Sequence, residues 1–355
     1  MSEVLIQEWV AEQLACTDVQ ALNWQALSSD ASFRRYFRCQ FDGQSYIVAL
    51  APPATEKNLE FVQISALLNA AGIQASQVVA VNYEHGFILQ NDLGQTLLSD
   101  QLSFDSVDRL YGLALKQLIQ MQHIPAAALD AVPAYDAAAL QLELSYFNQW
   151  FVSGMLNYTL SANEQLMLQA FFDDLCQSAL NQPQGFVHRD YHCRNIMITE
   201  RDELAAIDFQ DALVGPLSYD LVSLLRDCYV VWPESKVQLF VEQFWQLLVQ
   251  DKLLDNEQVS LAEFTEAFDL MGLQRHIKVL GIFARLSLRD AKHAYLQDLP
   301  TVVNYVAKIA KKQAQHSETA QAFSAWFETT LMPLIEQQSW WTAALIEKNI
   351  MQVNA

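Results

Sequence analysis

Four polar residues of the chain, His188, Asp190, Asn195 and Asp208, have the types and spacing needed for phosphoryl transfer. A hydrophobic pair precedes His188, and four residues separate Asp190 from Asn195. A second hydrophobic run follows Asn195, and a further one ends in Asp208. In such a pattern the first aspartate accepts the proton of a substrate hydroxyl, while the asparagine and second aspartate hold Mg²⁺ against the phosphates of ATP. We expect residues 186–209 to form a turned hairpin that gathers these side chains.

Each residue of this pattern has a predicted role. Asp190 is the general base, and a carboxylate is basic enough because the transition state is loose. Asn195 and Asp208 are the Mg²⁺ ligands, since carboxylate and amide oxygens suit this ion. His188 is grouped with the catalytic residues, although its expected work is to orient the loop by hydrogen bonding. Asp220 is expected to tether the same loop from the start of a helix.

The residues that would hold the nucleotide are harder to identify. The chain has no G-x-G-x-x-G loop, and residues 46–50, where a phosphate-binding lysine is expected, contain none. Arg34, Arg38 and Lys57 are the candidate phosphate ligands. Strand alternation puts Arg34 and Arg38 on one face and Arg35 on the other. The backbone of a hinge is expected to bind the adenine, and its residues are Gln90, Asn91, Asp92 and Leu93.

The composition narrows the class of protein. With 52% hydrophobic and 17% charged residues, the 355-residue chain is expected to fold around a full core. The net charge of −20 argues against nucleic acid or an anionic membrane as partner, because it would repel phosphate. Five dispersed cysteines without a C-x-x-C pair predict neither a disulfide framework nor a zinc site, and favour a cytoplasmic location. The first ten residues are typical of an amphipathic helix and not of a signal peptide, and no segment is apolar enough to cross a membrane.

Strand-like segments precede residue 92 and helical segments dominate after it. Residues 33–39 with 45–50, and 78–83 with 86–90, predict two hairpins. A helix over 59–71, ended by Gly72, is expected between the hairpins. Longer helices are expected over 107–122, 137–156 and 162–180. We therefore predict an α+β, two-lobed, protein-kinase-like fold, with a β-rich nucleotide-binding lobe at 1–92, a mostly helical lobe at 93–355 and a cleft at their hinge.

At these residues the chain resembles the aminoglycoside phosphotransferase-like family, which also includes choline kinases. The sequence I-D-F-Q-D-A at 207–212 stands where protein kinases have D-F-G. The segments S-F-R-R-Y-F-R at 32–38 and A-P-P at 51–53 most resemble bacterial kinases of N-acetylmuramate and N-acetylglucosamine. So do residues 221–227 and 271–286.

The resemblance implies an enzyme that uses ATP and Mg²⁺ to phosphorylate the anomeric hydroxyl of a small amino sugar, in peptidoglycan recycling. Arg226 and Arg275 could grip the lactyl carboxylate of N-acetylmuramate, because arginine binds carboxylates bidentately. Burial in Arg–Asp pairs is the alternative for both. Asp211 and Asp227 are further substrate candidates, although Asp211 is equally typical of a plain surface acid.

Other functions remain open from the sequence. A kinase of aminoglycosides, choline or homoserine would have the same catalytic pattern, and a non-catalytic nucleotide-binding protein could lack the lysine of the third strand. A protein kinase is disfavoured because residues 208–216 are too few for a long activation loop. We expect a monomer or a weak homo-oligomer.

Overall fold

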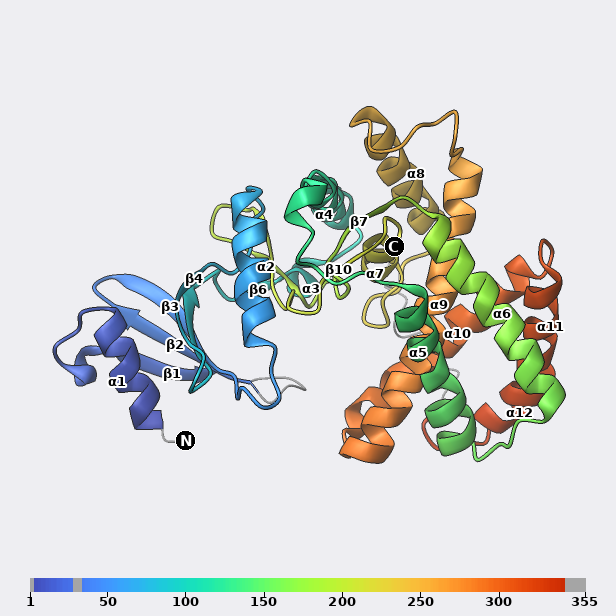
Figure 1. Cartoon of the computed structure of the whole chain (residues 1–355), viewed down its shortest axis with the longest axis horizontal. Helices are drawn as coiled ribbons and strands as arrows, with labels where there is room; N and C mark the ends of the chain where they lie inside the picture. Colours follow the sequence, from blue (N-terminus) through green and yellow to red (C-terminus); the bar gives the residue numbers. More distant parts are fainter. Residues whose placement is uncertain (1–2, 28–33, 342–355) are drawn as a thin grey trace. The chain divides into compact units, whose positions relative to one another are not determined.

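The computed structural model describes residues 3–27 and 34–341. The chain forms two compact units, of which the first contains Met1–Gln101 and Arg194–Ala212 and the second contains Leu102–Cys193 and Leu213–Ala355. An antiparallel sheet near the N-terminus and a mostly helical remainder confirm the predicted α+β class (Figure 1). The first unit extends beyond residue 92 and takes in a second segment of the chain, so it does not coincide with the predicted lobe 1–92, whose functional meaning stays a prediction.

The first unit is built on a five-stranded antiparallel sheet with the strand order β1-β2-β3-β5-β4. A smaller sheet has the order β6-β8-β9, and its β8 and β9 come from the second segment of the unit. The elements of this unit are α1 (Glu3–Gln13), η1 (Val19–Ala21), β1 (Asn23–Leu27), β2 (Arg35–Phe41), β3 (Gln44–Leu50), α2 (Asn58–Ala70), β4 (Val78–Asn82), β5 (Phe87–Asn91), β6 (Thr96–Leu97), α3 (Leu98–Gln101), β8 (Ile196–Ile198) and β9 (Leu204–Ala206).

The two faces of the five-stranded sheet have different roles. Helix α1 lies along one face (Figure 1). On that face, Phe37, Val48 and Leu89 belong to one hydrophobic core with Ile6 and Val10 of α1. Because side chains alternate along a strand, the intervening residues of β2 point to the other face. Arg38 of β2 is one of these residues.

Helices make up most of the second unit. Its elements are α4 (Val107–Gln122), η2 (Ala126–Ala128), α5 (Ala137–Tyr146), η3 (Phe147–Met155), α6 (Ala162–Asn181), β7 (Gln184–Val187), β10 (Leu213–Pro216), α7 (Tyr219–Leu225), α8 (Glu234–Gln250), α9 (Leu261–Asp290), η4 (His293–Asp298), α10 (Leu299–Gln313), α11 (Glu318–Trp326), η5 (Phe327–Leu331) and α12 (Met332–Ile335). β7 and β10 pair antiparallel.

The 30-residue helix α9 crosses the core of this unit, and many of its residues are buried. A capping box fixes its first turn, in which Ser260 accepts from the Glu263 backbone and the Glu263 side chain accepts in return. Gly281 lets α9 approach the backbone at Tyr146, since a Cβ there would lie 2.4 Å from the Tyr146 carbonyl carbon. This close packing fixes the position of α9, which carries Arg275, against the end of α5.

Most predicted elements are present, with some differences. The helix expected over 137–156 is α-helical only to Tyr146 and continues as the π-helical segment η3. The strand β1 was not predicted. The start of the strand expected at residue 33 lies outside the described residues. Within the described part of the chain, no helix has the length and apolarity to cross a membrane.

Candidate active site

The hairpin of β8 and β9 brings the two predicted metal ligands together. Asn195 immediately precedes β8, and Asp208 follows shortly after β9. Ile207 donates its backbone N–H to the Asn195 carbonyl oxygen at 3.0 Å, so the two residues lie at the same end of the hairpin. Asp208 has a φ of +64°, an uncommon left-handed conformation for a residue other than glycine. Such strained positions often mark functional sites.

The donor set of this hairpin suits a hard cation. One amide and one carboxylate offer oxygen, and Mg²⁺ usually binds to one or two carboxylates while phosphates supply the rest. Within residues 3–27 and 34–341, no cluster of three or more His, Cys, Asp or Glu side chains forms an alternative metal site. The residues present therefore fit a Mg²⁺ that arrives with a nucleotide.

Two of the predicted nucleotide ligands pair with each other. Arg38 donates from Nε to Asp92 Oδ2 at 2.6 Å and from Nη2 to Asp92 Oδ1 at 3.1 Å. Nη2 also donates to the Gly94 carbonyl at 2.8 Å, and Ser45 donates to Asp92 at 2.6 Å. These bonds hold the pKa of Asp92 below its ordinary value, although desolvation by itself would raise it. The pair thus fixes the segment that follows β5.

The other predicted hinge residues have structural contacts as well. Gln90 is buried near the end of β5, and its partner strands place it beside Ile47 and Val78. Asn91 accepts from the Gln77 backbone N–H at 2.6 Å through its side chain. Leu93 follows Asp92 and is half-buried. The backbone of this segment is therefore well anchored.

Lys57 and Asp211 form an ion pair of 2.7 Å within the first unit. Lys57 was a predicted phosphate ligand and Asp211 a predicted substrate contact. Their side chains are 56% and 35% exposed, so an ion pair of this kind contributes little to stability.

Asp220 ties the catalytic loop to the start of α7, as predicted. Its carboxylate accepts the backbone N–H of His188 at 2.6 Å and of Arg189 at 2.9 Å. Burial raises the pKa of Asp220 to about 7, against the effect of these two bonds. His188 is fully buried, which suits a residue that shapes the loop. Arg189 has a φ of +81°, so the backbone turns sharply just before Asp190.

Asp190 lies among positive charges from α9 and from its own loop. Arg275 Nη2 is 3.7 Å from Asp190 Oδ1, and Arg275 Nε donates to Ser223 Oγ at 2.9 Å. Desolvation would raise the pKa of Asp190, but the charges of Arg275 and Lys278 hold it below its ordinary value. Asp190 is therefore a carboxylate at neutral pH, and its side chain is 43% exposed. A substrate hydroxyl can reach it.

Sequence reasoning missed the buried network behind this loop. Glu143 of α5 forms ion pairs with Arg189 and, at 3.5 Å, with Lys278. The positive charges of Lys278 and Arg189 lower the pKa of Glu143, against its desolvation. Lys278 lies three positions after Arg275 on the same helix face, which is a spacing that could have identified it. Glu143 has no comparable signal, because it lies far away in the sequence.

Arg226, a predicted substrate ligand, is enclosed in the core. Its side chain is 0% exposed, and it pairs with Asp269 at 2.7 Å and with Glu234 at 2.9 Å. Its guanidinium carbon also lies 4.5 Å from the ring centre of Phe268. Buried Arg–Asp pairing was the alternative to substrate binding that the sequence analysis gave for Arg226. Asp269, Glu234 and Phe268 therefore hold the Arg226 guanidinium within the core of the protein.

Asp227, its neighbour, is buried too. It accepts the backbone N–H groups of Tyr229 at 2.7 Å and Val230 at 2.8 Å, and Cys193 Sγ lies 3.4 Å away. Burial raises the pKa of Asp227 to about 6. These bonds fix the turn that follows α7 and connect it to the catalytic loop through Cys193.

Asp269→Ala should destabilise the protein strongly, because it leaves the buried charge of Arg226 without its closest partner. Breaking a buried pair from one side typically costs about 3–5 kcal/mol. The free energy of unfolding from urea titration would measure the loss. Asp108→Ala is the matched control, since it removes the exposed Lys236 ion pair and should cost under about 1 kcal/mol. Equal small losses would contradict a structural role for Arg226.

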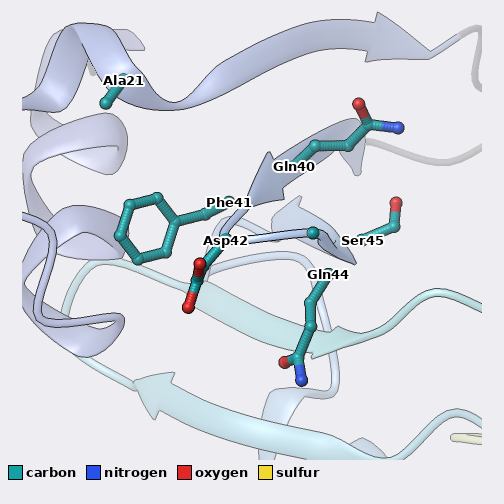
Figure 2. Close-up of a pocket in the computed structure, with 7 residues that line it drawn as sticks. Ala21, Gln40, Phe41, Asp42, Gln44 and Ser45 are labelled. Atoms are coloured by element: carbon teal, nitrogen blue, oxygen red, sulfur yellow. The ribbon is translucent and has the colours of Figure 1, made fainter.

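A separate hollow lies at the turn between β2 and β3 (Figure 2). It has a volume of about 300 Å³, and none of the predicted site residues lines it, although Ser45 of its lining donates to Asp92. Polar residues predominate in its lining, which consists of Ala21, Gln40, Phe41, Asp42, Gly43, Gln44 and Ser45. This turn is therefore a different surface feature from the candidate site.

Known proteins share both the sequence pattern and the fold. An N-acetylmuramate/N-acetylglucosamine kinase of Pseudomonas aeruginosa is 39% identical over 84% of this chain and 87% of its own length. A protein of the same name from Pseudomonas putida is 37% identical over 88% and 93%. The structure of a Plasmodium vivax ethanolamine kinase has the same fold, with a TM-score of 0.63 at 12% identity over 85% of this chain and 86% of its own.

The comparison with families covers most of the described site. Residues 23–253 match the family described as APH, the phosphotransferase enzyme family. This range includes every predicted site residue except Arg275. The resemblance inferred from the catalytic motif is thus confirmed, and with it the prediction of a phosphotransferase. The chain belongs to the phosphotransferase enzyme family.

Proposed function

We propose that this phosphotransferase transfers the γ-phosphate of ATP to the anomeric hydroxyl of N-acetylmuramate and N-acetylglucosamine, in the recycling of cell-wall sugars. The observation that carries the proposal is the exposed Asp190 carboxylate with Arg275 beside it. Two relatives with this substrate name, each matched over most of its length, support the sugar. The cytoplasm is the proposed location, because ATP is available there. We propose a monomer or weak homo-oligomer that binds neither nucleic acid nor membrane.

The anomeric hydroxyl suits the chemistry of Asp190. This hydroxyl is more acidic than an ordinary alcohol, so a carboxylate of low pKa can still accept its proton in the transition state. Asp190 would orient the hydroxyl and receive the proton as the bond to phosphorus forms. Asp220 and His188 would hold the loop in the required conformation through the bonds described above.

Asn195 and Asp208 would hold the Mg²⁺ that accompanies ATP. When bound, this ion neutralises phosphate charge that develops during transfer. The backbone of residues 90–93 would bind the adenine edge, and the Arg38–Asp92 pair would keep that segment rigid. Arg226 and Asp227 would act through the fold, because two carboxylates hold the Arg226 guanidinium and the Asp227 carboxylate accepts two backbone N–H groups.

A substrate panel tests the proposed function directly. ADP release should be measured with N-acetylmuramate, N-acetylglucosamine, kanamycin, choline and homoserine as acceptors. We expect turnover with the two N-acetylated sugars alone. Turnover with kanamycin or choline would favour another kinase of the same family. ATP binding without turnover of any acceptor would favour a nucleotide-binding protein without catalysis.

Arg275→Ala should weaken the use of N-acetylmuramate more than that of N-acetylglucosamine, because only the former carries a lactyl carboxylate. A charge-assisted pair contributes roughly 1.5–3 kcal/mol, so the ratio of kcat/KM values should change about tenfold to a hundredfold. Both sugars should also lose some turnover, since Arg275 lies beside Asp190. An equal loss for both would show that Arg275 only positions Asp190 and that another group binds the carboxylate.

A further inference from the structure

The third strand of the sheet lacks a cation for the phosphates. β3 has the sequence Q-S-Y-I-V-A-L, which contains no basic residue. Phosphoryl transfer concentrates negative charge at the phosphates, and kinases place at least one basic side chain there in addition to the metal. The predicted candidates for this charge, Arg34, Arg38 and Lys57, all lie in the first unit.

Arg34 is positioned just before β2 in a way that suits this task. Its side chain is 3% exposed, and its Nε lies 2.7 Å from Glu56 Oε2. Its guanidinium carbon is 5.4 Å from the ring centre of Phe61 on α2, and Phe61 stacks on Phe209 at 4.8 Å. A buried guanidinium is costly unless it is paired, so Glu56 and the ring fix Arg34 in place.

A single amide connects Arg34 to the predicted metal ligand. Arg34 Nη1 donates to Gln210 Oε1 at 3.0 Å, and Gln210 Nε2 donates to Asp208 Oδ1 at 2.9 Å. A guanidinium can only donate and a carboxylate can only accept, so the chemistry fixes the orientation of the amide between them. Glu56, Arg34, Gln210 and Asp208 thus form one continuous row of polar contacts.

The other basic candidates are engaged differently. Arg38 uses both Nε and Nη2 on Asp92. Arg35 points to the opposite face of the sheet, where it lies 5.2 Å from the ring centre of Phe37 and 3.6 Å from Glu3 of α1. Lys57 is 56% exposed and forms its ion pair with Asp211. Arg34 alone among these four is both buried and linked to Asp208.

We propose that Arg34 is the cation that binds the nucleotide phosphates, in place of a lysine on the third strand. Glu56 positions its guanidinium, and Gln210 couples it to the Mg²⁺-binding Asp208. The guanidinium attracts an ionised phosphate oxygen more strongly than the neutral amide oxygen of Gln210, because opposite charges add to the hydrogen bond, so a phosphate would compete well for Arg34. The inference rests on the proposed use of ATP but not on the identity of the sugar.

Nucleotide binding measured by calorimetry, without any sugar, tests this assignment. Arg34→Ala should weaken ATP binding about tenfold to a hundredfold, both with Mg²⁺ and with EDTA, because the contact with phosphate does not require the metal. Adenosine, which has no phosphate, should bind the variant as it binds the wild type. Arg35→Ala is the matched control, since it removes an adjacent arginine on the opposite face, and should leave both affinities unchanged.

Two further variants separate a role in phosphate binding from a role in folding. Arg34→Lys keeps the charge and should retain an intermediate affinity for ATP. Glu56→Gln should weaken ATP binding less than Arg34→Ala does, and again without effect on adenosine. Equal losses for ATP and adenosine in Arg34→Ala would overturn the proposal, and so would unchanged ATP binding. Wild-type protein that binds no ATP would overturn both this proposal and the proposed function, whereas ATP binding without sugar phosphorylation would overturn only the latter.

Discussion

Asp190→Asn should lower kcat about a hundredfold to ten-thousandfold, because it removes the group that accepts the hydroxyl proton in the transition state. Asparagine has nearly the same shape, so the loop should keep its conformation, which depends on the bonds of Asp220. ATP affinity should stay within about threefold, since an interaction made mainly in the transition state lowers kcat without weakening ground-state binding. Steady-state kinetics with N-acetylglucosamine and calorimetry with ATP measure the two quantities.

The control for this variant is another aspartate of the second unit. Asp130 is exposed, and Asp130→Asn should leave kcat unchanged. The loss of the Arg275 contact could also alter the loop, so unfolding of the Asp190 variant should be compared with the wild type. An Asp190→Asn protein with wild-type kcat and a raised KM would contradict the assignment, because the residue would then only bind substrate.

Asp208→Asn should instead weaken nucleotide binding that depends on Mg²⁺. The carboxylate supplies the charge that attracts the cation, and a neutral amide replaces it. We expect the affinity for ATP in the presence of Mg²⁺ to fall at least about tenfold to a hundredfold, a range typical of damage to a metal site. With EDTA, the variant should bind ATP no more weakly than the wild type, since one negative charge near the phosphates has been removed. Calorimetry under both conditions separates the two effects.

Asp202 offers a matched control within the same hairpin. It lies in the turn between β8 and β9 with a φ of +59°, close to the +64° of Asp208, and asparagine tolerates this conformation well. Asp202→Asn should therefore change neither affinity. If both variants lose Mg²⁺-dependent binding equally, the hairpin conformation and not the Asp208 carboxylate would be responsible.

Local sequence patterns were sufficient to predict much of the fold and the structure of the catalytic segment. Apolar spacing identified α4 and α6, and the alternation of β2 correctly separated Arg34 from Arg35. The hairpin that joins Asn195 to Asp208 was expected from two short apolar runs with a turn between them. The tether from Asp220 was also expected, because an acid at the start of a helix readily accepts backbone N–H groups.

Long-range pairing was not accessible from the sequence. Arg38 and Asp92 are 54 positions apart, and no local rule shows that they satisfy each other. Glu143 meets Arg189 across 46 positions, and Arg226 meets Asp269 across 43. Residues 194–212 join the first unit although they follow α4, α5 and α6 of the second unit in the chain. Such long-range pairs depend on which charged side chains the folded core brings together.

The most direct test of the central claim is the position of the phosphate on the product. Wild-type protein should be incubated with ATP, Mg²⁺ and either N-acetylmuramate or N-acetylglucosamine, and the product examined by ¹H and ³¹P NMR. We predict a phosphate ester on the anomeric oxygen, seen as phosphorus coupling to the anomeric proton, and its absence in the Asp190→Asn sample. Phosphate on any other hydroxyl, or no transfer to either sugar, would contradict the account.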